Sequence, residues 1–505
     1  MTERRKWIVL YSLALLPMVG FWAYGLLDMD EGFYSAVSSE MLRRGEWLTP
    51  YYNGKPWFEK PILIYWATMP TLQLFGGEFG MRLPSVLATL GLYVVCAWFA
   101  SKRLSVRAGQ WVLLILCSGL LVAGLGRMAM TDALFNLVFT GAMLAFLQSL
   151  LGDRRWRVLA GFLLGVSTLA KGPVGCVIFA FVAVFVFIRQ PTVRPSYRGW
   201  WLAGVVAFAT AAASWYLPAY LANPDAFVSD FLIQQNVGRF QGGDRAHTLS
   251  GPQSWFFYVP VLFLGLFPWS WWIVPSWRMK GEDPLLRYLA VWAASVFAFF
   301  TASGAKLPHY ILPAIPPLAL MVAALFTQRE RNEDAQGKAR SFLRRGPGDR
   351  REGSRPWLPN GALIAVLAMS LLLNLGMPAY YRGLFPGTPD QGEIHCMVKK
   401  VLARNPDVVF ASFRMGRQNK ADLGTGKLKL QETELPSLIF YLDTTILKTD
   451  QPEDLAREAR PVVAFTRADR MTPNVLEEIG RLGRKAKPLE RGRYYEAWRI
   501  ESDAR

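Results

Sequence analysis

The sequence predicts a polytopic α-helical membrane protein that carries a small soluble α/β domain at its C-terminal end. Of its 505 residues, 52% are hydrophobic, which is more than a soluble globular chain of this length normally carries. These residues gather in runs of roughly 20, the length that crosses a bilayer as a helix. Beyond residue 378 the apolar runs shorten to strand length. We therefore predict a transmembrane domain over residues 1–378 and a soluble domain over residues 379–505.

About eleven segments satisfy the length and apolarity of a membrane span. In chain order they are 7–27, 83–100, 109–126, 132–151, 156–170, 172–188, 200–221, 254–276, 286–303, 308–327 and 358–378. The run 61–76 is apolar too, but it is short and contains Pro70. We interpret it as an interfacial or re-entrant helix. The charge-rich segment 328–356 is predicted to be a flexible cytoplasmic loop.

Lysine and arginine predict the orientation of these spans. With a cytoplasmic N-terminus, the loops assigned to the inside carry more than twice as many of them as the outer loops, as the positive-inside rule requires. Counting 61–76 as a span would reverse this bias. The outer loops and the C-terminal domain are therefore expected on the periplasmic face of a bacterial inner membrane. The net charge of +18 then reflects topology, and we expect membrane lipids but no nucleic acid as partners.

The C-terminal domain is predicted from short apolar runs that alternate with polar helical patterns. The expected strands are 408–413, 437–442, 461–466 and 494–500, and the expected helices are 452–460 and 474–485. Three of the four cysteines lie inside apolar runs and Cys396 stands apart. We therefore predict neither a disulfide framework nor a cysteine-type zinc site.

The first outer loop begins with the acidic run Asp28-Met29-Asp30-Glu31, directly after the first span ends at Leu27. An apolar pattern at helical spacing follows this run, which predicts a helix over about 31–44 that lies along the membrane surface. In a purely structural interpretation Asp30 caps this helix and Glu31 favours its positive N-terminal end. In a functional interpretation a carboxylate held here acts as a general base or orients an acceptor.

Further charged residues lie at the outer ends of other spans. Lys60 follows Glu59 just before the interfacial run, and it either extends toward the membrane surface or binds a lipid phosphate. Thr131 and Asp132 suit the start of a helix. Arg127 and Asp132 lie at a membrane boundary, where charges pair with each other or with a ligand.

Cations and histidines recur in the remaining outer loops, at Lys171, Arg239, His247, Lys306 and His309. A histidine at a bilayer edge is usually only a polar anchor. However, the positive-inside rule disfavours outer cations, and here they recur across five loops. Their retention indicates an anionic ligand.

These residues belong to an ordered series of motifs. The series is Asp30-Glu31-Gly-Phe-Tyr34, Gly45-Glu-Trp47-Leu-Thr-Pro50, Asn53-Gly54-Lys-Pro-Trp-Phe58-Glu59-Lys60-Pro61, Arg127…Thr131-Asp132, Ala170-Lys171-Gly172-Pro173, Asn236…Arg239-Phe240 and Lys306-Leu-Pro…Tyr310-Ile-Leu-Pro313. Over about residues 7–327 it resembles the aminoarabinose transferases of lipid A modification, and more broadly the glycosyltransferases of GT-C fold related to protein O-mannosyltransferases. The aminoarabinose enzymes are usually drawn with thirteen spans, as against about eleven here.

The resemblance implies an inverting glycosyltransferase with an undecaprenyl-phosphate sugar donor and an active site between the outer loops and the membrane. It assigns catalytic roles to Asp30 and Asp132, and it places Lys60 and Tyr310 at the donor phosphate. It also implies a structural zinc at Glu59 and His247, although two ligands make an incomplete zinc site.

The chemistry of such a transfer accounts for the remaining residues. The leaving group is a lipid phosphate, so the protein mainly needs cations that offset its charge. The further candidates for this role are Arg127, Arg239 and Lys306, and the other candidate pocket residues are Glu31, Tyr34, Lys171 and His309. With a lipid A phosphate as acceptor, Asp30 would orient it. With a hydroxyl of a protein or glycan, Asp30 would act as the base.

Other classes of function fit the sequence less well. A transporter or lipid flippase predicts ionisable residues near the bilayer midplane, whereas these spans are nearly free of charge. An O-antigen ligase or polymerase shares lipid-linked sugars but lacks the ordered motifs. A receptor or scaffold would not explain outer cations in five loops. The sugar stays open between 4-amino-4-deoxy-arabinose and another pentose or hexose, and the acceptor between lipid A, a protein Ser/Thr and another glycan.

Overall fold

The computed structural model describes residues 1–189, 200–238, 252–279, 283–344, 357–385, 388, 390–405, 407–415 and 435–502. The chain divides into two compact units. Unit 1 comprises Met1–Phe21, Glu59–Ile64 and Pro84–Asn374, and unit 2 comprises Trp22–Phe58, Tyr65–Leu83 and Leu375–Arg505. Unit 2 thus joins most of the first outer loop to the C-terminal domain. The boundary predicted after residue 378 stays a prediction.

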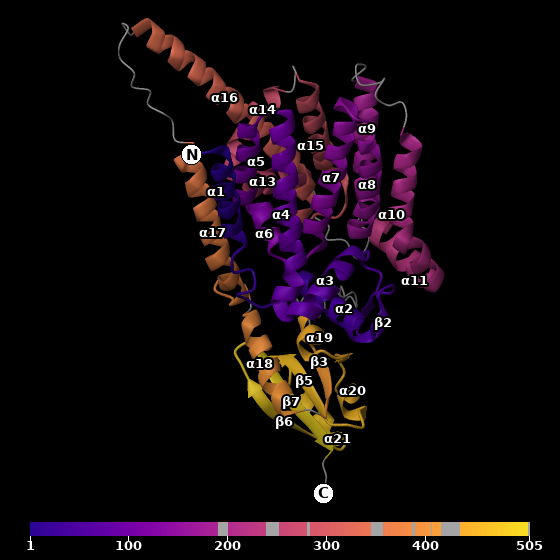
Figure 1. The fold of residues 1–505 in the computed structure, drawn as a ribbon. Helices are drawn as coiled ribbons and strands as arrows, with labels where there is room; N and C mark the ends of the chain where they lie inside the picture. The colour runs from indigo at the N-terminus through magenta and orange to yellow at the C-terminus, as the bar shows by residue number, and fades with distance from the viewer. Residues whose placement is uncertain are drawn as a thin grey trace. The chain divides into compact units, whose positions relative to one another are not determined.

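Unit 1 is helical (Figure 1). Its main helices are α1 (Glu3–Leu15), α5 (Val106–Ser118), α6 (Leu120–Gly126), α7 (Thr131–Leu151), α8 (Trp156–Lys171), α9 (Val174–Arg189), α10 (Trp201–Ala222), α13 (Tyr258–Gly265), α14 (Ile273–Arg278), α15 (Pro284–Ala302), η7 (Pro308–Ala314) and α16 (Ile315–Arg344), with most of α4 (Gly77–Arg103) and α17 (Asn360–Tyr381). Its shorter elements are η1 (Leu16–Met18), α11 (Pro224–Ala226), η3 (Phe227–Gly238), η4 (Pro252–Phe256) and η5 (Trp269–Trp272). Each of the eleven predicted spans overlaps one or more of these helices.

By length and composition, six helices of the described residues could cross a membrane, or up to eight if each of two bent pairs forms one span. The bends are 65° between α5 and α6, at Gly119, and 111° in the segment that contains Pro268. At Gly119 the backbone is extended, and at Pro268 the ring denies the backbone an amide donor. The predicted count of about eleven stays a prediction.

The first predicted span, 7–27, is not one continuous helix. Helix α1 ends at Leu15 and continues only as the 3₁₀ turn η1 around Pro17. Gly20 then adopts φ +78°, which favours glycine. A Cβ there would lie 2.5 Å from Oδ1 of Asn374 in α17. The apolar run is therefore longer than its helix.

Unit 2 contains a five-stranded mixed sheet in the order β4-β3-β5-β7-β6. The strands are β3 (Val409–Phe413), β4 (Leu447–Thr449), β5 (Val462–Arg467), β6 (Arg484–Arg491) and β7 (Tyr495–Ser502). β3 is parallel to β4 and β5, whereas β7 is antiparallel to β5 and β6. Helices α20 (Pro452–Arg457) and α21 (Pro473–Arg481) share an apolar core with the sheet, which includes Phe413 and Ile479. The predicted α/β domain is confirmed.

Three local predictions for the C-terminal half and the loop before it need correction or extension. The run 437–442 is helix α19 (Ser437–Leu442) instead of a strand, and it packs on α2 (Asp30–Arg44). The sequence analysis missed β4, β6 and helix α18 (Gln391–Arg404). The predicted loop 328–356 is helical as far as Arg344, because α16 extends through it. Residues 345–356 lie outside the described residues.

The first outer loop forms two helices and a two-stranded hairpin, β1 (Tyr51–Tyr52) with β2 (Lys55–Pro56). Helix α2 is the one predicted at 31–44, and it ends at Gly45 with φ +66°. Its residues from Glu31 to Met41 are nearly all buried, more than a helix resting on a membrane surface requires. Helix α3 (Leu63–Phe75) occupies the run 61–76 and is only 13 residues long. It is a helix that is too short to span, as predicted.

Candidate functional site

A cluster of charged and aromatic side chains lies at one end of the helices in unit 1. Asp132 is the second residue of α7 and Lys171 the last residue of α8. These consecutive helices pack together, so the start of one lies beside the end of the other. The turn η7, which carries His309 and Tyr310, packs against α7. We call Asp132, Lys171, His309 and Tyr310 the outer-end cluster.

The ammonium of Lys171 is the centre of this cluster. It donates a hydrogen bond to Oδ1 of Asp132 and lies 4.6 Å from the centroid of the Tyr310 ring, a cation–π contact. Nε2 of His309 lies 4.0 Å from the other carboxylate oxygen. Lys60 is also close enough to interact electrostatically with Asp132. Five of the predicted site residues thus lie close together, namely Lys60, Asp132, Lys171, His309 and Tyr310.

The structure rejects the capping interpretation of Thr131 and Asp132. The N-cap of α7 is Met130, and no side chain caps the helix. The Asp132 side chain is 3% exposed, while those of Lys171 and His309 are each 14% exposed. A carboxylate that is buried so deeply requires a cationic partner. Its role here is to pair with Lys171, and part of the cluster stays accessible.

Two other predicted phosphate ligands have structural contacts in unit 1. Arg127 is fully buried and donates to the carbonyl of Pro17 and to Oδ1 of Asn374. The Lys306 ammonium donates to three backbone carbonyls at the end of α15, at 2.5 to 3.0 Å. These three bonds use all its donors, and burial lowers its pKa. The predicted contacts of Arg127 and Lys306 with a phosphate stay predictions.

Glu31 in unit 2 forms a fully buried ion pair with Arg82. Nε and Nη2 of Arg82 donate to the two carboxylate oxygens at 2.7 and 2.6 Å, and both side chains are 0% exposed. Arg82 also donates to the carbonyls of Tyr24 and Gly25, and Glu31 accepts from the amide of Leu27. The pair therefore fixes the chain before α2.

Asp30, directly before Glu31, is exposed. It is the first residue of α2, whereas Met29 is the N-cap and makes no side-chain capping bond. The predicted capping role of Asp30 is thus wrong. Its carboxylate faces outward from a segment whose other acidic groups are buried, which leaves it available for chemistry. Tyr34, one turn later, is buried, and its ring lies 6.5 Å from that of Tyr65.

Asp28 begins a second buried network in unit 2. Its carboxylate accepts hydrogen bonds from the amide and the hydroxyl of Ser437. Nε2 of His395 lies 3.0 Å from the same hydroxyl, and Nδ1 lies 2.7 Å from the hydroxyl of Tyr381. Burial raises the pKa of Asp28 to about 7 and lowers the pKa of His395 to about 3. The histidine is therefore neutral at pH 7, with one nitrogen that donates and one that accepts.

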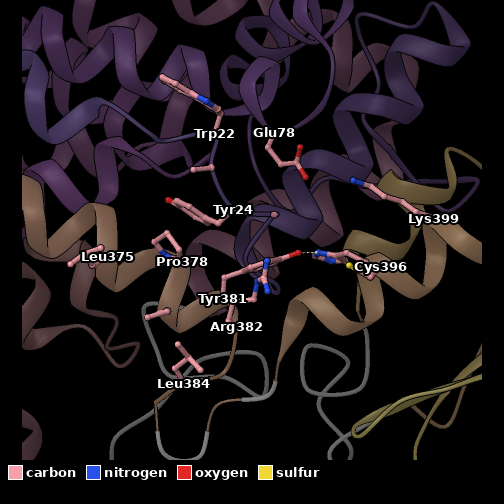
Figure 2. A pocket seen from close by; sticks show the side chains of 14 residues that line it. Trp22, Tyr24, Glu78, Leu375, Pro378, Tyr381, Arg382, Leu384, Cys396 and Lys399 are labelled. Carbon is pink, nitrogen blue, oxygen red and sulfur yellow. Dashed lines mark hydrogen bonds between the residues drawn. The ribbon is translucent and has the colours of Figure 1, made fainter.

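A cavity of about 550 Å³ adjoins this network. Figure 2 shows its wall, with Trp22, Glu78, Arg382 and Lys399 among the labelled residues and the hydrogen bond from Tyr381 to His395 drawn as a dashed line. The thiol of Cys396 also lines it and is exposed. The cavity connects one end of the buried network to solvent.

Arg239 and His247 lie outside the described residues. Glu59 is partly exposed at the bend before α3. Within the described residues no three His, Cys, Asp or Glu side chains come close enough to hold a metal ion. The zinc suggested for Glu59 and His247 stays a prediction.

The sequence analysis missed Asp28, Arg82, Ser437 and His395 as parts of a polar network. Asp28 could have been included, because it belongs to the same acidic run as Asp30. The signal for Arg82 was its position as an outer cation. No sequence pattern connects Ser437 or His395 to the first loop, which lies more than 360 residues earlier.

Sequence comparison relates the chain to known glycosyltransferases. Residues 59–217 match the family described as dolichyl-phosphate-mannose-protein mannosyltransferase. The chain is 30% identical over 394 residues to an undecaprenyl phosphate-α-4-amino-4-deoxy-L-arabinose arabinosyl transferase of Pseudomonas paraeruginosa, covering 75% of this chain and 68% of that relative. The chain belongs to this family of arabinosyl transferases. To the corresponding transferase of Shewanella sediminis it is 34% identical over 326 residues, which cover 62% of this chain and only 57% of that relative.

The fold is that of the arabinosyl transferase family. The crystal structure of ArnT from Cupriavidus metallidurans bound to undecaprenyl phosphate superposes with a TM-score of 0.73 at 21% identity, covering 98% of both chains. This likeness confirms the predicted helical membrane fold with a C-terminal α/β domain. The chain is accordingly a multi-pass membrane protein of the arabinosyl transferase family.

Proposed function

We propose that this chain is an inverting glycosyltransferase that moves 4-amino-4-deoxy-L-arabinose from undecaprenyl phosphate to lipid A. Its relatives are undecaprenyl phosphate-α-4-amino-4-deoxy-L-arabinose arabinosyl transferases, which supports this sugar and this lipid carrier. The observation that carries the proposal is the outer-end cluster, where Lys171 is paired with Asp132 beside His309 and Tyr310. The Asp132–Lys171 pair has no net charge, and the positively charged Lys60 lies close to Asp132. Such a site suits a phosphate group that is bound before the transfer and released after it.

In the proposed reaction the bond between the anomeric carbon and the phosphate oxygen breaks, and the acceptor oxygen bonds to that carbon from the opposite face. The electron pair of the broken bond leaves on undecaprenyl phosphate. Lys60 and Lys171 offset the charge that develops there, and Tyr310 donates its hydroxyl to the same group. Asp132 holds Lys171 in position.

Asp30 is assigned to the acceptor. If the acceptor is a lipid A phosphate, it already carries a negative charge, and Asp30 orients it through the neighbouring hydroxyl or amine groups. If the acceptor is a hydroxyl, Asp30 removes its proton as general base. The reaction is placed on the periplasmic face of the inner membrane, because the charge distribution predicts that the loops carrying these residues lie there.

A second candidate is transfer of a sugar from a polyprenyl phosphate to Ser or Thr of a protein. It is supported by the match of residues 59–217 to the dolichyl-phosphate-mannose-protein mannosyltransferase family. The two candidates share the lipid-phosphate leaving group and differ in the acceptor. The same residues of the outer-end cluster therefore serve both.

The test is mass spectrometry of lipid A and of glycoproteins from cells that contain or lack the gene. We expect a lipid A species that carries one additional aminoarabinose to disappear without the gene, and to stay absent when the gene carries Asp30→Asn. Asp469→Asn, which changes an exposed carboxylate in the C-terminal domain, should restore the species fully. Loss of a protein-linked sugar instead would select the second candidate. Unchanged lipid A and glycoproteins would reject both.

A further inference from the structure

The exposed Asp30 occupies a segment that is fixed on both sides by buried hydrogen bonds. After it, Glu31 is held by Arg82. Before it, Asp28 is held by residues that lie far away in sequence, in the C-terminal domain. Because the Asp30 side chain itself is exposed, the path of the backbone determines where its carboxylate lies.

We propose that the C-terminal α/β domain positions Asp30 for catalysis, with Ser437, Gln391 and Tyr441 as positioning residues. This inference rests on the proposed function, in which Asp30 acts on the acceptor. None of the three residues is assigned any contact with substrate.

Each positioning residue holds a different group of the segment. The Ser437 amide and hydroxyl donate to the carboxylate of Asp28. Oε1 of Gln391 accepts from the Asp28 amide at 3.1 Å, and the Tyr441 hydroxyl accepts from the amide of Leu26 at 2.9 Å. The amides of Leu26 and Asp28 are thereby satisfied by side chains of α18 and α19. Unsatisfied buried amides are costly, so this segment depends on the C-terminal domain.

When the Asp28 carboxylate is ionised, the bond from Ser437 to it has a defined direction. A neutral His395 donates from one nitrogen and accepts at the other. If Ser437 donates to the Asp28 carboxylate, its oxygen accepts from Nε2, and Nδ1 then accepts from Tyr381. The three bonds run in one direction, from the cavity wall at Tyr381 to the segment that carries Asp30.

This set of residues is not a nucleophilic triad. The Ser437 side chain is buried, at 0% residue exposure, and no substrate reaches it. It also stands between His395 and Asp28, whereas in a triad the histidine occupies the middle position. The position of Ser437 suits a residue that holds the Asp28 carboxylate in place.

Two glycines show how closely these parts pack. A Cβ on Gly32 would lie 2.2 Å from Oδ1 of Asp28 and 2.8 Å from the Ser437 amide nitrogen. A Cβ on Gly25 would lie 2.4 Å from the Tyr381 hydroxyl. Even one methyl group would therefore displace the network, so a small shift of α19 would be transmitted to the segment.

The experiment uses the full-length protein in detergent, with undecaprenyl phosphate-aminoarabinose as donor and lipid A as acceptor. Ser437→Ala and Tyr441→Phe each remove one hydroxyl, and Ser437→Thr keeps it. We expect both hydroxyl deletions to lower kcat by about 10- to 100-fold, as misplacement of a reacting group does. The donor KM should stay within about twofold. Ser437→Thr should regain most of the kcat.

The matched control is Ser412→Ala, which removes a hydroxyl from β3 in the same domain. It should keep kcat and should have a melting temperature like that of the other variants. Full kcat in both Ser437→Ala and Tyr441→Phe would overturn the inference. So would a fall in kcat that only parallels a fall in melting temperature and appears equally in Ser412→Ala. Full activity of Asp30→Asn would instead reject the proposed function.

Discussion

Two ion pairs with buried carboxylates, Glu31–Arg82 in unit 2 and Asp132–Lys171 in unit 1, differ in how completely their polar groups are used. Arg82 makes a two-pronged contact with Glu31, and two backbone carbonyls accept its other described bonds. Both side chains are fully buried. Lys171 makes one hydrogen bond to Asp132 among the described residues, and its side chain is 14% exposed.

This difference separates a structural pair from a pair suited to binding. An ammonium has three donors, so Lys171 retains capacity for an anion while Asp132 holds it in place. Arg82 is engaged with the protein on several sides. The contrast teaches that charge type and membrane depth alone do not identify a site. Remaining donor capacity and access are what distinguish the pair that we propose as the phosphate site.

The largest expected effect is on stability, at the structural pair. Arg82→Met leaves Glu31 as a buried carboxylate without its cation, which should cost about 3–5 kcal/mol. The melting temperature of the purified protein should fall accordingly, and the double variant Glu31→Met/Arg82→Met should recover part of the loss. As a control, Lys487→Ala breaks an exposed pair with Glu501 and should cost about 0–1 kcal/mol. If Arg82→Met were no less stable than this control, the structural assignment would fail.

The next effect is on rate, at the outer-end cluster. Lys171→Gln keeps a donor for Asp132 but removes the positive charge. We expect the transfer rate to fall by about 10²–10³-fold, the usual cost of one electrostatic contact in a transition state. The melting temperature should change far less than with Arg82→Met. A fully active Lys171→Gln would show that the accessible pair is not the phosphate site.

The third effect concerns pH and Asp28. Because burial raises the pKa of this carboxyl to about 7, the folded state binds a proton more tightly than the unfolded state does. Its contribution to stability is fully present below about pH 4, the ordinary value for Asp, and is lost as the pH rises through 7. Glu31 and Ser437 act on the group, and His395 lies 4.0 Å away. The melting temperature should fall between pH 5 and 8, and it should fall less with Asp28→Asn. Equal slopes would contradict the burial of this carboxylate.

The smallest effect tests the packing around the same network. Gly32→Ala forces a methyl group against Asp28 and should cost about 1–3 kcal/mol, as overpacking usually does. Gly480→Ala is the matched control, because a Cβ there meets no atom within 4 Å. In helix α21 it should be neutral or stabilise by up to about 1 kcal/mol. A tolerated Gly32→Ala would show that the segment is less tightly held than Glu31–Arg82 implies.

Much of the helical fold could be predicted from sequence, because long apolar runs have few alternatives. Short runs do not. Residues 437–442 are apolar enough for a strand or a helix, and their packing on α2 decides the outcome. The charged residues at the outer ends of the spans were also recognisable, because outer cations are rare. The pairing of Asp132 with Lys171 could not be predicted, because it depends on the packing of α7 against α8. The pairing of Glu31 with Arg82 could not be predicted either, because no motif connects the two residues.

The exposed thiol of Cys396 makes the natural sequence convenient for spectroscopy. Cys96 and Cys117 are buried and Cys176 is only partly accessible, so an impermeant maleimide dye should react first at Cys396. A fluorophore attached there would report on the cavity wall beside Tyr381 in an otherwise unaltered protein. Labelling of intact cells would then reveal from which side of the bilayer this wall is reached.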